Sequence, residues 1–203
     1  MKNIITIQHT HSLHHTNGMI GSLTEWELTE FGKAQAECIG ENMRNFIGNN
    51  AYIMYSSTQI RARQTADIVA RHLGLDYITD ERLREQNLGE AVGKSVKWAN
   101  ENTIVWMKNV DDRPFSGAET KREKWNSISP FVNQILKSDD DNIILVSHGG
   151  TLSIFAAIWL GLKAEDLNLC DLAASSGGVS IFQENSDGKR IIKKLNDMSF
   201  LKK

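Results

Sequence analysis

Residues 142–161 read NIILVSHGGTLSIFAAIWLG and contain the repeating unit of the fold in one stretch. The run from Asn142 to Ser147 is short, apolar and rich in β-branched side chains, which is typical of a buried strand. A His-Gly-Gly turn at 148–150 follows, and an apolar segment from Thr151 to Leu160 then ends at Gly161. The stretch therefore predicts a buried strand that leads through a turn into a helix.

The same alternation of strand and helix precedes this stretch. A β-branched run near the amino terminus and a second run about fifty residues later are each followed by an amphipathic helical pattern that ends at a glycine. A third, weaker strand comes next. The predicted strands cover 4–8, 52–55 and 77–79, and the two helices end at Gly48 and Gly74.

The region from about 93 to 137 breaks the alternation because it has no strand pattern. It predicts two helical stretches separated near 111–114, with Pro130 interrupting the second, and we expect a helical flap here. Aromatic side chains of such a flap are candidates for an apolar wall beside a substrate. These aromatic residues are Trp98, Trp106, Phe115 and Trp125.

The carboxyl-terminal part predicts a β-hairpin. Apolar runs at 179–183 and 190–195 flank Asn185 to Gly188, which contains an Asp-Gly turn signal. Together with the preceding elements, this predicts a single domain over residues 1–203. Its fold class is α/β, a three-layer α/β/α sandwich whose mostly parallel central sheet has an antiparallel edge. An exposed edge strand near the hairpin is a candidate surface for a homodimer.

Composition limits the classes of function. The chain has 203 residues, a net charge of -2 and 40% hydrophobic residues, which is ordinary for a globular domain and leaves no basic stripe for nucleic acid. No apolar run is long enough to span a bilayer, so we expect a cytoplasmic protein without a membrane partner. Cys38 and Cys170 stand alone and are expected to be buried free thiols without a role.

Polar residues follow each predicted parallel strand, where open α/β sheets bind ligands. His9 follows the first strand, Ser56 and Arg61 the second, Glu85 the third, and His148 the fourth. Two imidazoles, a guanidinium and a carboxyl group suit phosphoryl transfer, because they supply a nucleophile, charge stabilisation and an acid. This chemistry requires no metal and no cofactor, and it predicts a small phosphorylated substrate.

Four motifs around these residues resemble those of the histidine phosphatase superfamily, also called the phosphoglycerate mutase-like family. They occur in the family's order at successive strand ends, which is far more specific than any one of them alone. LTEFG at 28–32 is similar to the family's first-helix signature, and GAET at 117–120 is similar to its Gly-Glu-Ser turn. The four motifs are IQHT at 7–10, SSTQIRARQTA at 56–66, LRE at 83–85 and VSHGG at 146–150.

The resemblance implies a role for each residue of the set. His9 is then the phosphorylated nucleophile, Arg61 and His148 bind the phosphoryl group, and Glu85 is the proton donor, with Glu90 as the substitute candidate in the same loop. Further residues of the motifs and of the first loop are candidates for binding the substrate. These are Gln8, Thr10, His15, Ser56 and Gly149.

Gln8 departs from the family pattern, which has an arginine before the nucleophilic histidine. A charge-assisted hydrogen bond contributes about 1.5–3 kcal/mol, so a neutral amide here weakens phosphate binding. His15 lies where the family usually has an asparagine near the phosphate, and its protonated imidazole would restore the charge at low pH. The alternative for the tract His9, His11, His14 and His15 is a metal site, which we rank lower because the tract lacks carboxylates.

Three functions follow from the resemblance and its departure. The leading one is a phosphomonoester hydrolase that works through a phosphohistidine on His9. A phosphoglycerate mutase-type phosphoryl transferase is the alternative, which we disfavour because the chain is compact and known mutases of the family resemble longer chains. A non-catalytic module that binds phosphate or another anion is the third, and retention of both nucleophile and acid argues against it. The residues do not identify the substrate.

Overall fold

The computed structural model describes residues 1–202. Both strand and helix positions follow the sequence pattern closely. The strands are β1 (Asn3–Gln8), β2 (Ile53–Ser57), β3 (Tyr77–Asp80), β4 (Asn142–Ser147), β5 (Val179–Glu184) and β6 (Arg190–Asp197). The α-helices are α1 (Glu30–Ile47), α2 (Ile60–Leu73), α3 (Val96–Asn102), α4 (Lys121–Lys137) and α5 (Gly149–Trp159).

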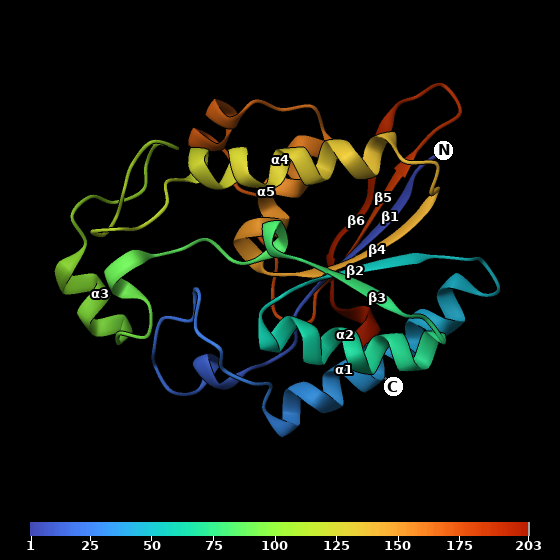
Figure 1. The fold of residues 1–203 in the computed structure, drawn as a ribbon, viewed down its shortest axis with the longest axis horizontal. Helices are drawn as coiled ribbons and strands as arrows, with labels where there is room; N and C mark the ends of the chain where they lie inside the picture. Colours follow the sequence, from blue (N-terminus) through green and yellow to red (C-terminus); the bar gives the residue numbers. More distant parts are fainter. Residues whose placement is uncertain (203) are drawn as a thin grey trace.

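The strands form one six-stranded sheet in the order β3-β2-β4-β1-β5-β6 (Figure 1). β1, β2, β3 and β4 pair in parallel, whereas β5 is antiparallel to β1 and to β6. The prediction of a mostly parallel sheet with an antiparallel edge is confirmed. Gln8 of β1 pairs with Ser147 of β4, so the two strands leave the sheet at the same level. This register positions the candidate site, because His9 and His148 are the next residues.

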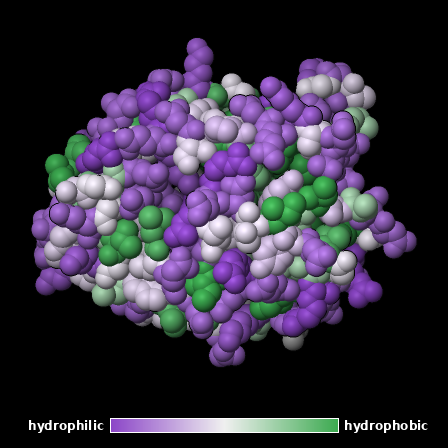
Figure 2. All heavy atoms as spheres, viewed as in Figure 1, coloured by the Kyte–Doolittle hydropathy of each residue, from purple (hydrophilic) through white to green (hydrophobic). Residues whose placement is uncertain are grey.

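Helices cover both faces of the sheet and make the three layers visible in Figure 1. α1 and α2 pack on one face, where Ile39 and Met43 are fully buried against β1 and β4. α4 and α5 pack on the other face, where Phe131 and Trp159 are fully buried. The face drawn in Figure 2 is mostly hydrophilic, with apolar side chains in small separate groups. The apolar side chains of strands and helices are therefore buried in two cores, one on each face of the sheet, and these cores hold the strand ends in place.

α1 begins where the sequence predicts, and its first turn touches the candidate site. Thr29 caps the helix by accepting a hydrogen bond from the Gly32 amide at 3.0 Å. A Cβ atom on Gly32 would lie 1.9 Å from the backbone oxygen of His11. Only glycine fits here, and this close approach fixes the loop that carries the histidine tract.

Pro130 does not interrupt the second helix of the middle region, and that prediction is wrong. α4 runs through it from Lys121 to Lys137. The residues that follow, Phe131, Val132 and Ile135, are buried in the core with α5. Their burial offsets the cost of the missing amide hydrogen bond, which is about 3 kcal/mol in an exposed helix interior.

The predicted flap divides into two parts. α3 and the chain up to Thr120 lie to one side of the sheet, at the left of Figure 1, whereas α4 belongs to the core. The aromatic residues divide in the same way and do not form one wall. Phe115 is buried and stacks with Trp98 at 6.1 Å between ring centroids, whereas Trp106 is 64% exposed. Trp125 packs against the main core.

Two further expectations concern single residues and membrane helices. Cys170 is exposed and Cys38 is partly exposed, so the prediction that both thiols are buried is wrong. Cys170 follows the 3-10 helix Ala164–Asn168 and stands next to Leu169, which is 93% exposed. Within residues 1–202, no helix combines the length and the apolar character needed to cross a membrane.

Candidate active site

The carboxyl ends of β1 and β4 bring His9 and His148 together. Their ring centroids lie 5.1 Å apart, and both side chains are buried, with 3% and 0% of their surface exposed. Parallel strands end at the same edge of a sheet, so neighbouring strands present their next residues to one another. The predicted convergence of these two histidines is what the structure shows.

The imidazole of His9 is oriented as a nucleophile. Its Nδ1 lies 2.8 Å from the backbone oxygen of Thr10, and since a carbonyl only accepts, Nδ1 carries the proton and donates it. The lone pair is therefore on Nε2, which accepts a hydrogen bond from Nε of Arg61 at 3.2 Å. Burial, and next the charge of Arg61, lower the pKa of His9 well below its usual value. The ring is neutral at neutral pH, as a nucleophile must be.

Arg61 lies in the first turn of α2 and reaches across the site to the first loop. Its Nη1 donates to the backbone oxygen of Thr24 at 2.8 Å and its Nη2 to that of Ser22 at 2.7 Å. Burial lowers its pKa to about 10, so the guanidinium remains charged at neutral pH. Arg61 thus places one positive charge beside His9 and ties the covering loop over it.

His148 is held by Ser57, a residue that the sequence analysis did not select. Nε2 of His148 and Oγ of Ser57 are hydrogen-bonded at 2.8 Å. Nδ1 of His148 is buried and has no partner among residues 1–202. The predicted Ser56 points elsewhere, and its hydroxyl donates to the backbone oxygen of Ser57 at 3.1 Å. Alternation along β2 could have favoured Ser57, because adjacent strand residues point to opposite faces of a sheet.

Glu85 lies at the amino terminus of α5, next to the turn that follows His148. Its Oε2 accepts a hydrogen bond from the Gly150 amide at 3.2 Å, and its Oε1 accepts one from the Gln86 amide at 2.9 Å. Gln59 of the second motif accepts from the backbone amide of Glu85 at 2.7 Å and holds its loop in place. Glu90, in contrast, is exposed on the 3-10 helix Gly89–Ala91. The geometry therefore favours Glu85 over Glu90.

Gln8 and Gly149 meet on the other side of the strand ends. A Cβ atom on Gly149 would lie 3.1 Å from Oε1 of Gln8, so the small residue leaves room for the amide. This amide is buried, and its Oε1 has no hydrogen-bond partner among the described residues. Thr10, in contrast, makes its hydrogen bonds within the fold. Its backbone amide donates to Oγ1 of Thr65 at 3.1 Å. Thr10 therefore positions His9 through its carbonyl and keeps its side chain within the fold.

Two histidines of the first loop, His14 and His15, pack beside His9. The rings of His14 and His15 lie 3.9 Å apart, and that of His15 lies 5.8 Å from His9. Burial lowers the pKa of His14 to about 3 and also lowers that of His15. His15 is therefore neutral at neutral pH, and the charge that we expected it to supply at low pH requires a pH below its usual pKa. Within residues 1–202, no three histidine, cysteine or acidic side chains are arranged to hold a metal ion.

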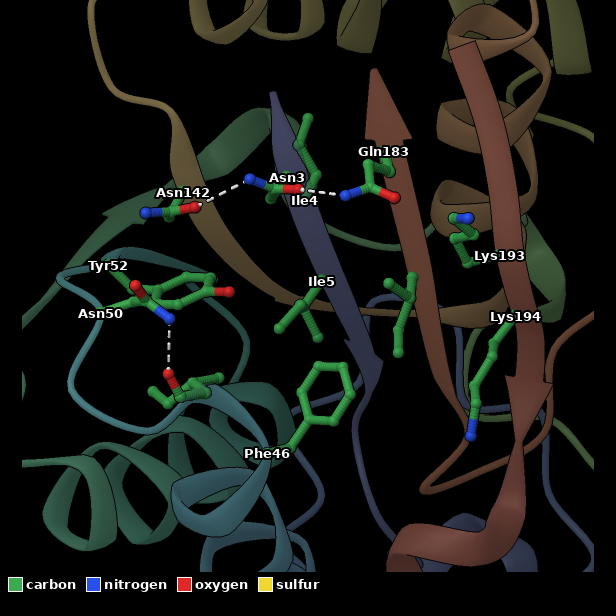
Figure 3. Close-up of a pocket in the computed structure, with 12 residues that line it drawn as sticks. Asn3, Ile4, Ile5, Phe46, Asn50, Tyr52, Asn142, Gln183, Lys193 and Lys194 are labelled. Carbon is green, nitrogen blue, oxygen red and sulfur yellow. Dashed lines mark hydrogen bonds between the residues drawn. The ribbon is translucent and has the colours of Figure 1, made fainter. Parts of the chain in front are cut away.

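Cavities occur at both ends of the sheet. One of about 550 Å³ opens at the amino end of β1, between Ile5, Phe46, Tyr52 and Lys194 (Figure 3). This cavity is larger than the second one. His9, however, follows the opposite, carboxyl end of β1, so the larger cavity does not contain the candidate site. The other, of about 320 Å³, is lined by Glu85 with neighbouring charged residues and adjoins the site. These charged neighbours include Arg84, Glu119 and Lys124.

Comparison with known proteins agrees with this geometry. The model of the histidine phosphatase superfamily (branch 1) matches residues 4–197. The chain is 29% identical over 184 residues to the "Putative phosphoserine phosphatase 2" of Hydrogenobacter thermophilus, covering 89% of this chain and 88% of that one. It is 26% identical over 196 residues to a 2,3-bisphosphoglycerate-dependent phosphoglycerate mutase of Nitrobacter winogradskyi, covering 91% and 92%.

Solved structures show the same fold. A mycobacterial glucosyl-3-phosphoglycerate phosphatase in complex with VO3 superposes with a TM-score of 0.83 at 19% identity, covering 97% of this chain and 99% of that one. The Nitrobacter mutase is matched over 92% of its own length, so it is hardly longer than this chain. Chain length therefore does not separate mutases from phosphatases here. The prediction that a mutase would be a longer chain is wrong for this relative.

Proposed function

This chain belongs to the histidine phosphatase superfamily, branch 1, and from that premise we propose that it hydrolyses small phosphomonoesters through a phosphohistidine on His9. The observation that carries the proposal is the state of this imidazole. It is neutral, its Nδ1 proton is held by the Thr10 carbonyl, and its Nε2 lone pair faces the guanidinium of Arg61. An imidazole in that state is a nucleophile with a stabilising cation beside the reacting atom.

In the first step, Nε2 of His9 attacks phosphorus. The bond between nitrogen and phosphorus forms while the ester bond between oxygen and phosphorus breaks. The leaving oxygen takes a proton from the carboxyl group of Glu85. Arg61 moves from Nε2 to the phosphoryl oxygens, because a lone pair that accepts its hydrogen bond cannot attack phosphorus at the same time. The bond from Nδ1 to Thr10 stabilises the charge that develops on the ring.

In the second step, water attacks the phosphohistidine. Glu85, now a carboxylate, takes a proton from the water, the new bond between oxygen and phosphorus forms, and the bond to Nε2 breaks. Its electron pair returns to the imidazole, and inorganic phosphate leaves. The amide of Gly150 at the amino terminus of α5 stabilises the carboxylate between the two steps.

A phosphatase is favoured over a mutase by the names of the relatives. The Hydrogenobacter protein, more similar to this chain than the Nitrobacter mutase, is named a phosphatase. The mutase remains the second candidate because that relative is matched over most of both chains. The two reactions share the first step and differ in whether water or a second hydroxyl group receives the phosphoryl group.

A quench experiment tests the proposal. The protein is mixed with a panel of phosphomonoesters that includes phosphoserine and 3-phosphoglycerate, quenched in alkali, and analysed for phosphate release and for an acid-labile phosphoryl group on His9. A phosphatase releases phosphate at the rate at which the label turns over. Label that turns over only when 2,3-bisphosphoglycerate and 3-phosphoglycerate are both present would establish the mutase. If no ester gives either a labelled His9 or released phosphate, the proposal fails and the non-catalytic binding module is the function that remains.

The matched control is a histidine of the same chain outside the site. His72 lies on α2 and bonds to Glu37, so His72→Asn tests the effect of losing a histidine as such. It should leave both label and turnover unchanged. A cytoplasmic location, a homodimer and the absence of nucleic-acid or membrane partners stay predictions.

A further inference from the structure

Gln59 lies between β2 and α2, and no step of the proposed mechanism uses its side chain. The residue is fully buried. Its Oε1 accepts a hydrogen bond from the backbone amide of Glu85 at 2.7 Å, and its Nε2 donates to the backbone oxygen of Ser22 at 2.8 Å. Because an amide N–H only donates and a carbonyl oxygen only accepts, these partners fix which end of the side-chain amide is which. Gln59 therefore joins the loop of the candidate acid to the loop that covers His9.

Ser22 holds the loop of the candidate acid one residue further along the chain. Its hydroxyl group donates to the backbone oxygen of Gln86 at 2.6 Å and accepts from the backbone amide of Leu88 at 2.9 Å. The φ angle of Ser22 is 39°, in the left-handed region that residues other than glycine rarely adopt. Such a conformation costs free energy and persists only where the surrounding contacts impose it. Here those contacts include both bonds to the loop of the acid.

The backbone oxygen of Ser22 connects the support of the acid with the candidate cation. It accepts hydrogen bonds from Nε2 of Gln59 at 2.8 Å and from Nη2 of Arg61 at 2.7 Å. A carbonyl oxygen has two lone pairs, and these two donors use both of them. A shift of this one oxygen therefore disturbs the cation and the support of the acid together.

The loop of the acid keeps other attachments when the bonds to Gln59 and Ser22 are lost. Oγ of Ser147 donates to the backbone oxygen of Leu83 at 2.6 Å, and Oγ1 of Thr151 donates to that of Arg84, also at 2.6 Å. Both bonds hold residues that precede the acid in the chain. Loss of the Gln59 amide should therefore displace the acid without detaching its loop.

We propose that Gln59 and Ser22 are positioning residues for the general acid, which hold the backbone of Glu85 and Gln86 so that the carboxyl group of Glu85 reaches the leaving oxygen. This inference rests on the proposed function and adds two residues to its first step. A general acid must come within about 2.6–3.2 Å of the atom that it protonates, so a loosened backbone lowers the rate of proton transfer. Bond cleavage that needs no proton is not affected in this way.

Two esters of similar size separate misplacement of the acid from a general loss of structure. Benzyl phosphate releases an alkoxide that needs a proton as it leaves, whereas 4-nitrophenyl phosphate releases a stable phenolate that does not. The measured quantity is kcat/KM, because it reports the step in which the leaving group departs and not the later hydrolysis of the phosphohistidine. Gln59→Met keeps the length of the side chain without its amide. It should lower kcat/KM about ten- to a hundredfold for benzyl phosphate and less than about threefold for 4-nitrophenyl phosphate.

Three further variants complete the comparison. Glu85→Gln should show the same selective loss as Gln59→Met, and a larger one, because it removes the proton itself. Ser22→Ala removes the bonds to Gln86 and Leu88, and it should lower kcat/KM for benzyl phosphate alone, about fivefold. The matched control is Gln64 on α2, whose Oε1 accepts from the Leu28 amide at 2.7 Å, so Gln64→Met should change both values less than about twofold.

An equal loss with both esters would overturn the proposal. The affected protein must match the parent in circular dichroism and thermal unfolding, so that the loss reflects the site. If Gln59→Met does not fold, Ser22→Ala decides by the same ratio of the two kcat/KM values. Hydrolysis by the parent with an equal loss in the variant means that the proposed function stands and the positioning role fails.

Hydrogen exchange of the Glu85 amide gives a readout without turnover. It is measured by NMR on the whole protein, and this amide should exchange about tenfold faster or more in Gln59→Met and at the parent rate in Gln64→Met. Unchanged exchange in Gln59→Met would overturn the proposal. If the parent hydrolyses neither ester while this exchange is faster, the proposed function fails and the hold of Gln59 on the Glu85 backbone stands.

Discussion

The two ends of β1 and β4 carry similar polar residues in opposite states. At the amino end, Asn3 donates to Asn142 at 3.0 Å and accepts from Gln183 at 3.2 Å, so three amides satisfy one another (Figure 3). At the carboxyl end, Gln8 and His148 each leave a buried atom without a partner among residues 1–202. Polar groups that pair within the fold stabilise it, whereas a buried polar atom without a partner lowers stability by about 1–3 kcal/mol.

This difference also explains why size alone does not identify the site. The 550 Å³ cavity lies at the amino end, where the polar groups are already paired. The groups that we propose to react lie at the carboxyl end, under a loop whose Ser22 and Thr24 carbonyls accept hydrogen bonds from Arg61. Changes at the carboxyl end should therefore alter activity, and changes at the amino end should alter stability alone.

Removing the nucleophile should have the largest effect. His9→Asn keeps a side chain of similar polarity but has no lone pair that can attack phosphorus, so we expect kcat to fall on the order of 10⁴-fold or more. Steady-state hydrolysis of the best ester, with thermal unfolding as the folding control, checks this. Activity within tenfold of the parent would exclude His9 as the nucleophile.

Removing the cation should come next. Arg61→Met keeps much of the side-chain volume but loses the charge and the ties to the Ser22 and Thr24 carbonyls. We expect kcat/KM to fall about 10²–10³-fold. Arg61→Lys restores the charge without the fork of donors and should recover part of the loss. Equal activity of the Met and Lys variants would show that the charge is not used.

The buried histidines predict acid sensitivity of the carboxyl end. The pKa values of His9 and His148 are lowered in the folded protein, so unfolding takes up protons below the unfolded value near 6.5. Stability is therefore fully present above pH 6.5 and is lost as the pH falls below it, by about 1.4 kcal/mol per unit for each neutral histidine. Urea unfolding at pH 7.5, 6 and 5 measures the slope, and His148→Gln should reduce it by one proton. A slope that this substitution does not change would contradict the assignment.

Two neighbouring serines sharpen the comparison within the site. Ser57→Ala removes the hydrogen bond to Nε2 of His148, and we expect kcat/KM to fall about tenfold. Ser56→Ala, one residue away in β2, removes only a bond to backbone and should change kcat/KM less than twofold. The reverse order of effects would show that Ser56, and not Ser57, supports His148.

A substitution at the amino end should have the smallest effect, and it should change stability but not activity. Asn142→Ala removes the acceptor of the Asn3 amide and should lower the free energy of unfolding by about 1 kcal/mol with kcat/KM unchanged. Urea unfolding and hydrolysis are measured side by side. A fall in kcat/KM of tenfold or more would mean that the two ends of the sheet are coupled.

The local pattern of the chain predicted most of the fold. The run at 142–161, the capping residue Thr29 and the glycines that end the helices act within a few residues of themselves, so their effect is visible in sequence. Pro130 was misjudged for the opposite reason, since the residues after it gain their burial from α5, which is distant in the chain. The prediction that Cys170 is buried is wrong for the same reason, because the exposure of a loop residue depends on which distant residues pack against it.

The sequence by itself determined which chemical groups this protein has and in what order they follow the strands, and hence the identity of His9, Arg61, Glu85 and His148 as the candidate set. Only the tertiary structure decided which atoms of that set are engaged and which are free. The choice of Ser57 over Ser56, the neutral state of His14 and the unpaired Oε1 of Gln8 each depend on residues far apart in the chain. Hydrogen bonding and desolvation are properties of neighbours in space, which is why they appear only when the strands pair.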